Sequence, residues 1–197
     1  HGKNQALVTH QMDSLTYYVH FQWDDPNTQM SKKQDHDYRI IPENTSFSMS
    51  VDFSTNEAKK DLPNFEQTRV NSTENWEAFW ESGAAVDFSK CSDPRAFELE
   101  RRVVLSQYLT KIQCTSNEPP QETGLTYNSW YGKPHLEMHW WHGVHFSLWG
   151  RSALLKKSMP WYEKAKHKAL KLAERQGFSG LRWQKMTDPF GNESPSS

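Results

Sequence analysis

The first part of the chain, to about Val70, is dominated by short segments in which apolar and polar side chains alternate. The clearest examples are residues 14–21 and 46–53. This period of two places one row of side chains on a core and the other in water, which is typical of a β-strand. Residues 24–27 and 31–37 are rich in turn-forming and polar side chains, which favour bends and loops. The pattern predicts a run of antiparallel strands.

After about Ser72 the spacing of apolar residues becomes helical. Four helices are predicted, at residues 75–83, 93–113, 134–157 and 161–176. Their limits come from residues that start or stop helices, namely Gly83, Asp93 with Pro94, Pro134, Met159 with Pro160, and Gly177. The last helix has an apolar face of Ala165, Ala169, Leu172 and Ala173 and a Lys-rich outer face. A long, turn-rich connection, residues 115–132, separates the second and third helices, and connections of this length are often functional.

Strands that precede helices predict an α+β architecture. We expect an N-terminal antiparallel domain at residues 1–72 and a helical domain at residues 73–197. The predicted helices are few for a closed bundle, and the tail after Phe178 is loop-like. We therefore expect that both domains are incomplete and that the chain stops inside the second.

Charge and composition narrow the classes of partner. The chain has 23 Lys and Arg residues against 24 Asp and Glu residues, so no global basic field favours nucleic acid or an anionic membrane. No run approaches the roughly 20 apolar residues of a membrane-spanning helix. Nine tryptophans in a chain that is only 35% hydrophobic suggest aromatic side chains presented to a flat ligand or a partner. We predict neither a nucleic-acid partner nor a membrane partner.

Two further features concern compartment and thiols. The chain begins with His1 and no targeting leader follows, so a signal was either removed or lies outside this piece. The expected location is periplasmic or secreted, with the cytoplasm as the alternative. Cys91 and Cys114 permit at most one internal disulfide, and two unpaired thiols are the equal alternative.

The densest group of chemically active side chains lies at residues 130–149. On a helix, His135, His139 and His142 share a face, which raises the possibility of a zinc site. The order His-Glu-x-x-His of zinc proteases is absent, because Glu137 lies two residues before His139. Imidazoles also bind sugar hydroxyls or serve structural hydrogen bonds. We predict no metal and no cofactor, and keep the zinc hydrolase as an alternative.

Interleaved Trp, His, Glu and Lys side chains suit a neutral saccharide. A pyranose stacks its C–H face on an indole, while its hydroxyls need acceptors such as Glu137 and donors such as Lys133. The competing interpretation is that tryptophans fill the core, and we favour it for Trp149 and Trp161. A second cluster, residues 180–189, places an aromatic ring between cations in a loop, where contact with RNA is a minor alternative.

Several runs together resemble a known family. They are residues 120–125, 130–133, 135–142, 148–151 and 177–186, and the likeness extends from about Trp76 to the end. The chain resembles bacterial six-hairpin glycosidase-like proteins, relatives of glycoside hydrolase family 65, which contains maltose and kojibiose phosphorylases and hydrolases. The resemblance implies a β-sandwich followed by an (α/α)6 toroid, with the sugar bound where inner helices begin. Here we expect part of the sandwich and the first hairpins of an incomplete toroid.

The resemblance also suggests which residues hold the sugar. Glu137 falls near a Trp-Asp-Thr-Glu segment of the phosphorylases that holds the terminal sugar, although Leu136 and His139 depart from it. Trp183 and Lys185 match an aromatic loop over the same sugar. The family's general acid is a glutamate further along the toroid than this chain reaches, and neither Glu122 nor Glu137 matches it. The predicted substrate-binding residues are Trp130, Lys133, His135, Glu137, His139, Trp141, His142, Arg182, Trp183 and Lys185.

From these observations we predict a carbohydrate-active protein. The intact protein is expected to hydrolyse a glycosidic bond in an oligosaccharide or disaccharide, with phosphorolysis as the alternative. The catalytic residues stay unassigned, and this chain alone is expected to be inactive. The remainder of the toroid is an expected partner, as further chain or a companion chain. A non-catalytic carbohydrate-binding or structural protein is the alternative from another class.

Overall fold

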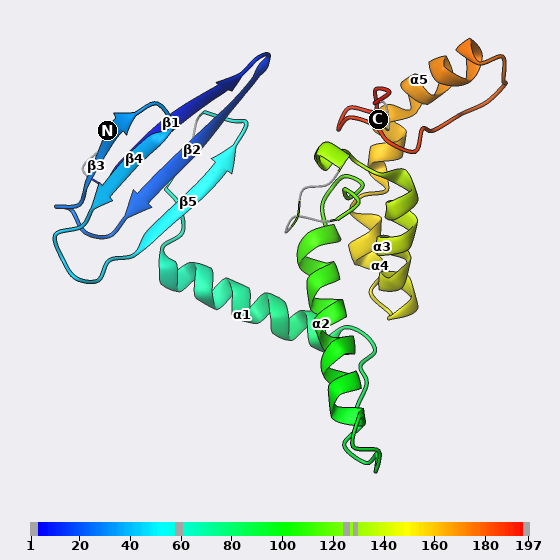
Figure 1. Cartoon of the computed structure of the whole chain (residues 1–197), viewed down its shortest axis with the longest axis horizontal. Coiled ribbons are helices and arrows are strands. Elements are labelled where there is room, and N and C mark those ends of the chain that lie inside the picture. Colours follow the sequence, from blue (N-terminus) through cyan, green and yellow to red (C-terminus); the bar gives the residue numbers. More distant parts are fainter. Residues whose placement is uncertain (1–3, 58–60, 124–126, 128–129, 195–197) are drawn as a thin grey trace. The chain divides into compact units, whose positions relative to one another are not determined.

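Figure 1 shows the computed structural model, which describes residues 4–57, 61–123, 127 and 130–194. The chain divides into two compact units, His1–Ala78 and Phe79–Ser197. Antiparallel strands come first and helices follow, so the predicted α+β class is confirmed. The division between the units lies within helix α1 (Phe65–Glu81), as does the predicted domain boundary after residue 72.

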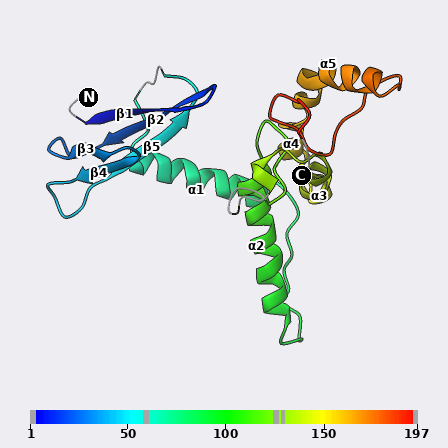
Figure 2. The same cartoon turned by 45° about the horizontal axis from the view of Figure 1, so that its top comes forward.

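The first unit contains two small antiparallel sheets among its described residues (Figure 2). One has the strand order β1-β2-β5, and the other is a hairpin of β3 and β4. The strands are β1 Gln5–Met12, β2 Leu15–Trp23, β3 Gln29–Gln34, β4 Asp37–Ile41 and β5 Met49–Ser54. The alternation seen in the sequence becomes a buried row, which consists of Ala6, Val8, Val19 and Trp23.

The predicted turn at residues 24–27 is confirmed, because the carboxylate of Asp25 accepts a hydrogen bond from the backbone N–H of Asn27 at 2.9 Å. The prediction of a loop at residues 31–37 is wrong. This segment forms most of the β3–β4 hairpin, and His36 takes the left-handed backbone conformation of its turn (φ 66°). Its side chains are mostly exposed, so no buried row marks it as strand in the sequence.

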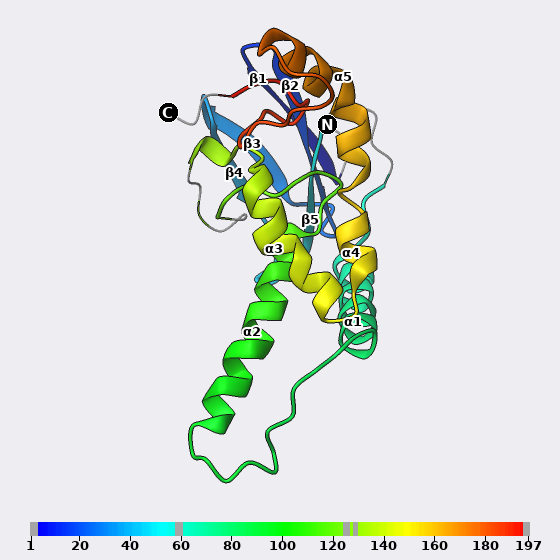
Figure 3. The same ribbon diagram turned by 90° about the vertical axis from the view of Figure 1, so that its right-hand side faces the viewer.

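The helical elements of the described chain occupy the region from residue 65 to residue 175 (Figures 1 and 3). They are α1 Phe65–Glu81, α2 Ala96–Cys114, the 3-10 turn η1 Trp130–Gly132, α3 Leu136–Leu148, α4 Ser152–Lys156 and α5 Pro160–Arg175. Helix α1 starts well before the predicted residue 75. The side chains of Asn64 and Gln67 accept hydrogen bonds from each other's backbone N–H groups, and this reciprocal cap starts the helix.

The predicted single helix at residues 134–157 is wrong, because two helices, α3 and α4, occupy this range. Gly150 adopts a left-handed conformation (φ 78°) between them. The N–H of Arg151 then donates to the carbonyl of Phe146 at 2.6 Å, which ends α3. The second predicted helix, by contrast, is confirmed as α2, and the Asp93 carboxylate accepts from the Arg95 N–H before it.

Helix α5 and its buried alanine face are confirmed as predicted. The helix begins at Pro160 and ends before Gly177, which is left-handed (φ 77°). Trp161 is buried, in agreement with its predicted core role, whereas Trp149 is only half-buried. The described helices do not form a closed (α/α)6 ring.

The segment after α5, residues 176–194, folds back onto this helix, and we call it the returning segment. The indole N–H of Trp161 donates to the carbonyl of Pro189 at 2.8 Å, and the N–H of Arg182 donates to the carbonyl of Ala169 at 3.2 Å. These bonds attach the returning segment to α5. A further backbone bond, from the N–H of Leu136 to the carbonyl of Lys185, joins it to the start of α3.

Candidate functional site

Segments from three parts of the chain meet at the first turn of α3. The N–H of His135 donates to the carbonyl of Pro120 at 3.0 Å, and His135 forms an antiparallel bridge with Met186. The N–H of Leu136 donates to the carbonyl of Lys185 at 2.8 Å. Because these are backbone bonds, they fix which side chains lie near one another at this point.

A charged pair and an indole lie on the surface beside this turn. The ammonium of Lys185 lies 3.2 Å from the carboxylate of Glu137. The side chain of Trp141, one turn further along α3, also favours the ionised form of this carboxylate. All three side chains are exposed. We call Glu137, Trp141 and Lys185 the α3 cluster.

The contacts within the α3 cluster stabilise the ionised form of Glu137. The hydrogen bond and positive charge of Lys185 lower the pKa of this carboxyl from its ordinary value of 4.5, with a smaller contribution from the indole of Trp141. Glu137 is therefore ionised at neutral pH. It offers hydrogen-bond acceptors and has no proton to donate.

Directly before α3, the 3-10 turn presents two aromatic rings in strained backbone. Trp130 and Tyr131 both have left-handed conformations (φ 50° and 60°), and both rings are exposed. The Lys133 ammonium lies 5.2 Å from the centre of the Tyr131 ring. Left-handed backbone is unfavourable for large side chains, and such strain often accompanies binding sites.

His135 supports α3 from inside. Its side chain is buried, and Nδ1 accepts a hydrogen bond from the N–H of Met138 at 3.3 Å, which caps the helix. Its Nε2 lies 4.0 Å from the carboxylate of Glu122. His135, which was predicted to contact a sugar, is therefore buried and caps α3 in the structure.

His139, on α3, is buried against Ser158 and against Tyr162 of α5. Its Nδ1 lies 2.8 Å from the Tyr162 hydroxyl and its Nε2 lies 2.7 Å from the Ser158 hydroxyl. The Ser158 hydroxyl donates its proton to the carbonyl of Leu155, so its oxygen must accept from Nε2 of His139. We therefore assign the imidazole proton to Nε2, and Nδ1 accepts a hydrogen bond from the Tyr162 hydroxyl. Burial lowers the pKa of His139 and raises that of Tyr162. Both ring nitrogens of His139 are occupied by protein.

The remaining histidine of the predicted face also has a protein partner. Nε2 of His142 donates to the carbonyl of Glu122 at 2.8 Å. Among the residues that the structure describes, no group of three His, Cys, Asp or Glu side chains is placed to hold a metal ion. The zinc alternative therefore lacks a ligand set within that part of the chain.

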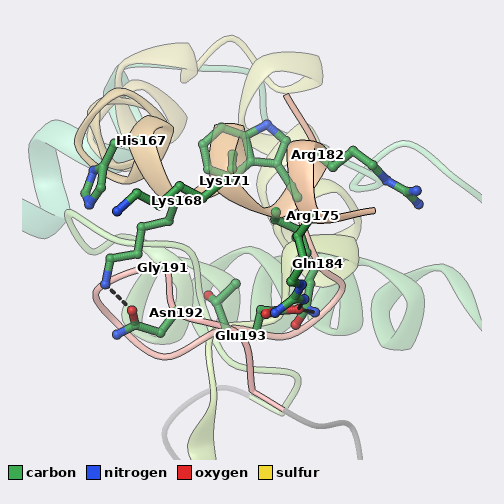
Figure 4. A pocket seen from close by; sticks show the side chains of 13 residues that line it. His167, Lys168, Lys171, Arg175, Arg182, Gln184, Gly191, Asn192 and Glu193 are labelled. Carbon is green, nitrogen blue, oxygen red and sulfur yellow. Dashed lines mark hydrogen bonds and ion pairs between the residues drawn. The ribbon is translucent and has the colours of Figure 1, made fainter. Parts of the chain in front are cut away.

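The described side-chain contacts of Arg182 and Trp183 are with Phe178, Trp161 and Tyr162, and none is with the α3 cluster. Arg182 and Trp183 line an open hollow of about 390 Å³ between α5 and the returning segment, and no residue of the α3 cluster lines it (Figure 4). The Trp183 ring packs edge-on against Tyr162, with centroids 5.2 Å apart. The Arg182 guanidinium lies 4.3 Å from the centre of the Phe178 ring.

The ten predicted binding residues therefore occupy several environments. The structure brings Glu137, Trp141 and Lys185 together on the surface, buries His135 and His139, and places Arg182 and Trp183 at the hollow. Sequence reasoning missed Tyr162 and Ser158 as partners of His139. No sequence signal links them, because the pairing depends on how α3 packs against a later segment.

Comparison with known proteins gives no assignment: no family model, curated protein or solved structure matches the chain. The resemblance to six-hairpin glycosidases stays a prediction. Within the described residues, every helix is too short or too polar to cross a membrane.

Proposed function

We propose that this chain is part of a carbohydrate-active protein and that the α3 cluster binds a saccharide. The observation that carries the proposal is the exposed indole of Trp141, one helical turn from the ionised carboxylate of Glu137, which in turn pairs with Lys185. An exposed indole offers a flat apolar face to a ligand. The polar groups around it are of the kinds that a sugar needs.

The chemistry of the three side chains matches a neutral pyranose. The C–H face of the ring stacks on Trp141, and its hydroxyls donate to Glu137 and accept from Lys185. Because the two charged groups already neutralise each other, a neutral ligand adds hydrogen bonds without leaving a charge unpaired. Trp130, Tyr131 and Lys133, which precede α3, extend the set of available contacts.

The proposed activity of the intact protein is hydrolysis of a glycosidic bond in an oligosaccharide or disaccharide, with phosphorolysis as the alternative. An inverting glycosidase needs a carboxylic acid that stays protonated until it donates to the leaving oxygen. Glu137 has a lowered pKa and does not suit this role. We therefore assign Glu137 to binding, place the general acid outside this chain, and expect the chain alone to be inactive.

The proposed architecture of the intact protein is a β-sandwich followed by an (α/α)6 toroid. Large apolar side chains are exposed along much of α2, which supports further helices packing there. They are Phe97, Leu99, Val104, Leu105, Tyr108, Leu109 and Ile112. The covering helices would come from further chain or from a companion chain. The periplasmic or secreted location rests on the sequence alone.

An oligosaccharide array probed with the full 197-residue chain tests the binding proposal. We expect binding to a subset of oligosaccharides, loss of that binding in Trp141→Ala, and retention in Trp140→Ala. The two tryptophans are matched, because they are 62% and 65% exposed on the same helix and only Trp141 contributes to the lowered pKa of Glu137. No binding, or equal loss in both variants, would overturn the proposal. A reducing-sugar assay on the intact protein then separates an enzyme from a non-catalytic binding protein.

A further inference from the structure

The hollow between α5 and the returning segment has a basic wall. Lys168, Lys171 and Arg175 line it and are spaced at i, i+3 and i+7, so they share one face of α5. Figure 4 shows Lys168 and Arg175 on its helical side and Asn192 and Glu193 on the opposite side. The lining thus combines fixed positive charge with polar groups from a second segment.

Most of this positive charge is not neutralised by carboxylates. Arg175 pairs with Glu193, but Lys168 donates to the neutral side-chain oxygen of Asn192. Within the described residues, no ion pair joins Lys168 or Lys171 to an acidic side chain. The Arg182 guanidinium, which points away from Lys168 in Figure 4, adds a further positive charge at the edge.

A buried hydroxyl in the same lining has no partner. Thr187 is 3% exposed, and its Oγ1 makes no hydrogen bond within the part of the chain that the structure describes. Buried polar groups without partners are uncommon because each costs free energy. Because Thr187 lines the hollow, its hydroxyl is a candidate donor to a ligand oxygen bound there.

The segment opposite α5 is held in place before any ligand arrives. The carboxylate of Asp188 accepts hydrogen bonds from the N–H groups of Phe190 and Asn192 and from the Asn192 side-chain amide. Gly191 has a left-handed conformation (φ 80°), and a side chain there would collide with Ala165 of α5. The hollow therefore has a second wall, the loop of residues 188–192, which a row of solvated lysines on a helix would lack.

We propose that this hollow is a binding site for a tetrahedral oxyanion, a sulfate or phosphate group, between Lys168, Lys171 and Thr187. Such a group carries several acceptor oxygens around one centre, which matches two ammonium groups and a hydroxyl on different sides. The half-buried indole of Trp183 also lines the hollow and offers a flat face to whatever carries the group. The site goes beyond the saccharide proposal, since no residue of the α3 cluster lines it.

The oxyanion has two possible sources, a free ion or an ester on a larger molecule. We would titrate the ¹⁵N-labelled full chain with inorganic phosphate, inorganic sulfate and a hexose 6-phosphate, and follow the amide NMR signals. Sodium chloride at matched ionic strength controls for screening. Saturable shifts at residues 167–175 and 187–193 that chloride does not produce are expected. If the hexose phosphate binds more tightly than inorganic phosphate, the natural ligand is a phosphate ester. If the two bind equally, the ligand is the free ion.

Variants show whether the named side chains are responsible. The double variant Lys168→Gln/Lys171→Gln should weaken phosphate binding roughly tenfold, whereas Lys156→Gln/Lys157→Gln, on exposed lysines that do not line the hollow, should leave it unchanged. Thr187→Val should weaken binding while the protein stays at least as stable, because it removes a buried hydroxyl without a partner. Shifts that do not saturate, or that persist unchanged in the Lys168→Gln/Lys171→Gln variant with a native spectrum, would overturn the proposal. Because inorganic phosphate and sulfate contain no sugar, their binding is measured independently of saccharide binding at the α3 cluster.

Discussion

The ammonium of Lys185 lies 3.2 Å from the carboxylate of Glu137, although one residue follows the last helix and the other belongs to the first turn of α3. The backbone bond between Leu136 and Lys185 holds the two segments together. The charge of the α3 cluster therefore depends on the return of the chain after α5. This dependence can be tested one residue at a time.

Removal of the Lys185 charge should raise the pKa of Glu137. In Lys185→Met the largest influence that lowers this pKa is lost, so the carboxyl should titrate nearer to 4.5 than in the wild type. A ¹³C NMR titration of the Glu137 carboxyl measures the change directly. An unchanged pKa would contradict the described contact.

The same pKa shift gives a pH dependence of stability. Because the folded-state pKa of Glu137 is lowered, its contribution is complete above the ordinary value of 4.5 and is lost as the pH falls through the folded-state pKa. The wild type should therefore lose more of its unfolding free energy than Lys185→Met as the pH falls below about 4.5. Urea unfolding of both proteins across this range provides the comparison, and parallel curves would contradict it.

Arg151 holds the second unit together from within. It is 4% exposed, its Nε donates to the carbonyl of Phe79 at 3.0 Å, and its Nη1 donates to the Gln107 side chain at 2.8 Å. Arg151→Met leaves the buried side-chain oxygen of Gln107 unpaired, whereas the Phe79 carbonyl keeps the hydrogen bond from the Ser82 hydroxyl. The substitution should lower the unfolding free energy by about 1–3 kcal/mol.

Urea unfolding measures the effect, with Arg182→Met as the control. The Arg182 side chain is exposed, and its guanidinium contacts only the face of Phe178 among the described interactions, so its loss should cost less than about 1 kcal/mol. Equal effects of the two substitutions would contradict a structural role for Arg151.

Gly191 and Gly180 form a matched pair for the returning segment. Both have left-handed backbone (φ 80° and 86°), so alanine at either position costs about 1–2 kcal/mol in backbone strain. Only at Gly191 does an added Cβ collide, 2.6 Å from the Cβ of Ala165, whereas nothing lies within 4 Å at Gly180. Thermal unfolding should show a larger loss for Gly191→Ala, and equal losses would contradict the packing of this loop.

The two thiols should differ in reactivity. Both cysteines are free, Cys91 is exposed, and burial raises the pKa of Cys114 to about 11. Because the thiolate is the reactive form, iodoacetamide at neutral pH should modify Cys91 at least roughly tenfold faster than Cys114. Mass spectrometry after brief exposure of the folded chain gives the two rates, and equal rates would contradict the burial of Cys114.

Local patterns in the sequence predicted most of the helices and strands. The alanine face of α5, its start at Pro160 and its end before Gly177 follow from spacing and capping chemistry, which act over a few residues. The β3–β4 hairpin and the break at Gly150 were missed for opposite reasons. The hairpin buries no apolar row, and apolar residues continue on both sides of the break.

The site was predicted less completely, because its contacts join distant segments. A period of 3.6 puts Glu137 and Trp141 on one face of a helix, and in the structure both lie exposed on α3. The same period cannot show that Tyr162 and Ser158 occupy the ring nitrogens of His139. Nor does it show that Trp183 packs against Tyr162 and lines the hollow.

The most direct test of the saccharide proposal is an NMR titration of the indole N–H signals with an oligosaccharide selected on the array. Trp141 and Trp140 are neighbours with similar exposure, and only Trp141 belongs to the α3 cluster. The account predicts a saturable shift of the Trp141 indole signal and a Trp140 signal that stays in place. A Trp141 signal that does not move, or one that moves together with Trp140, would contradict it.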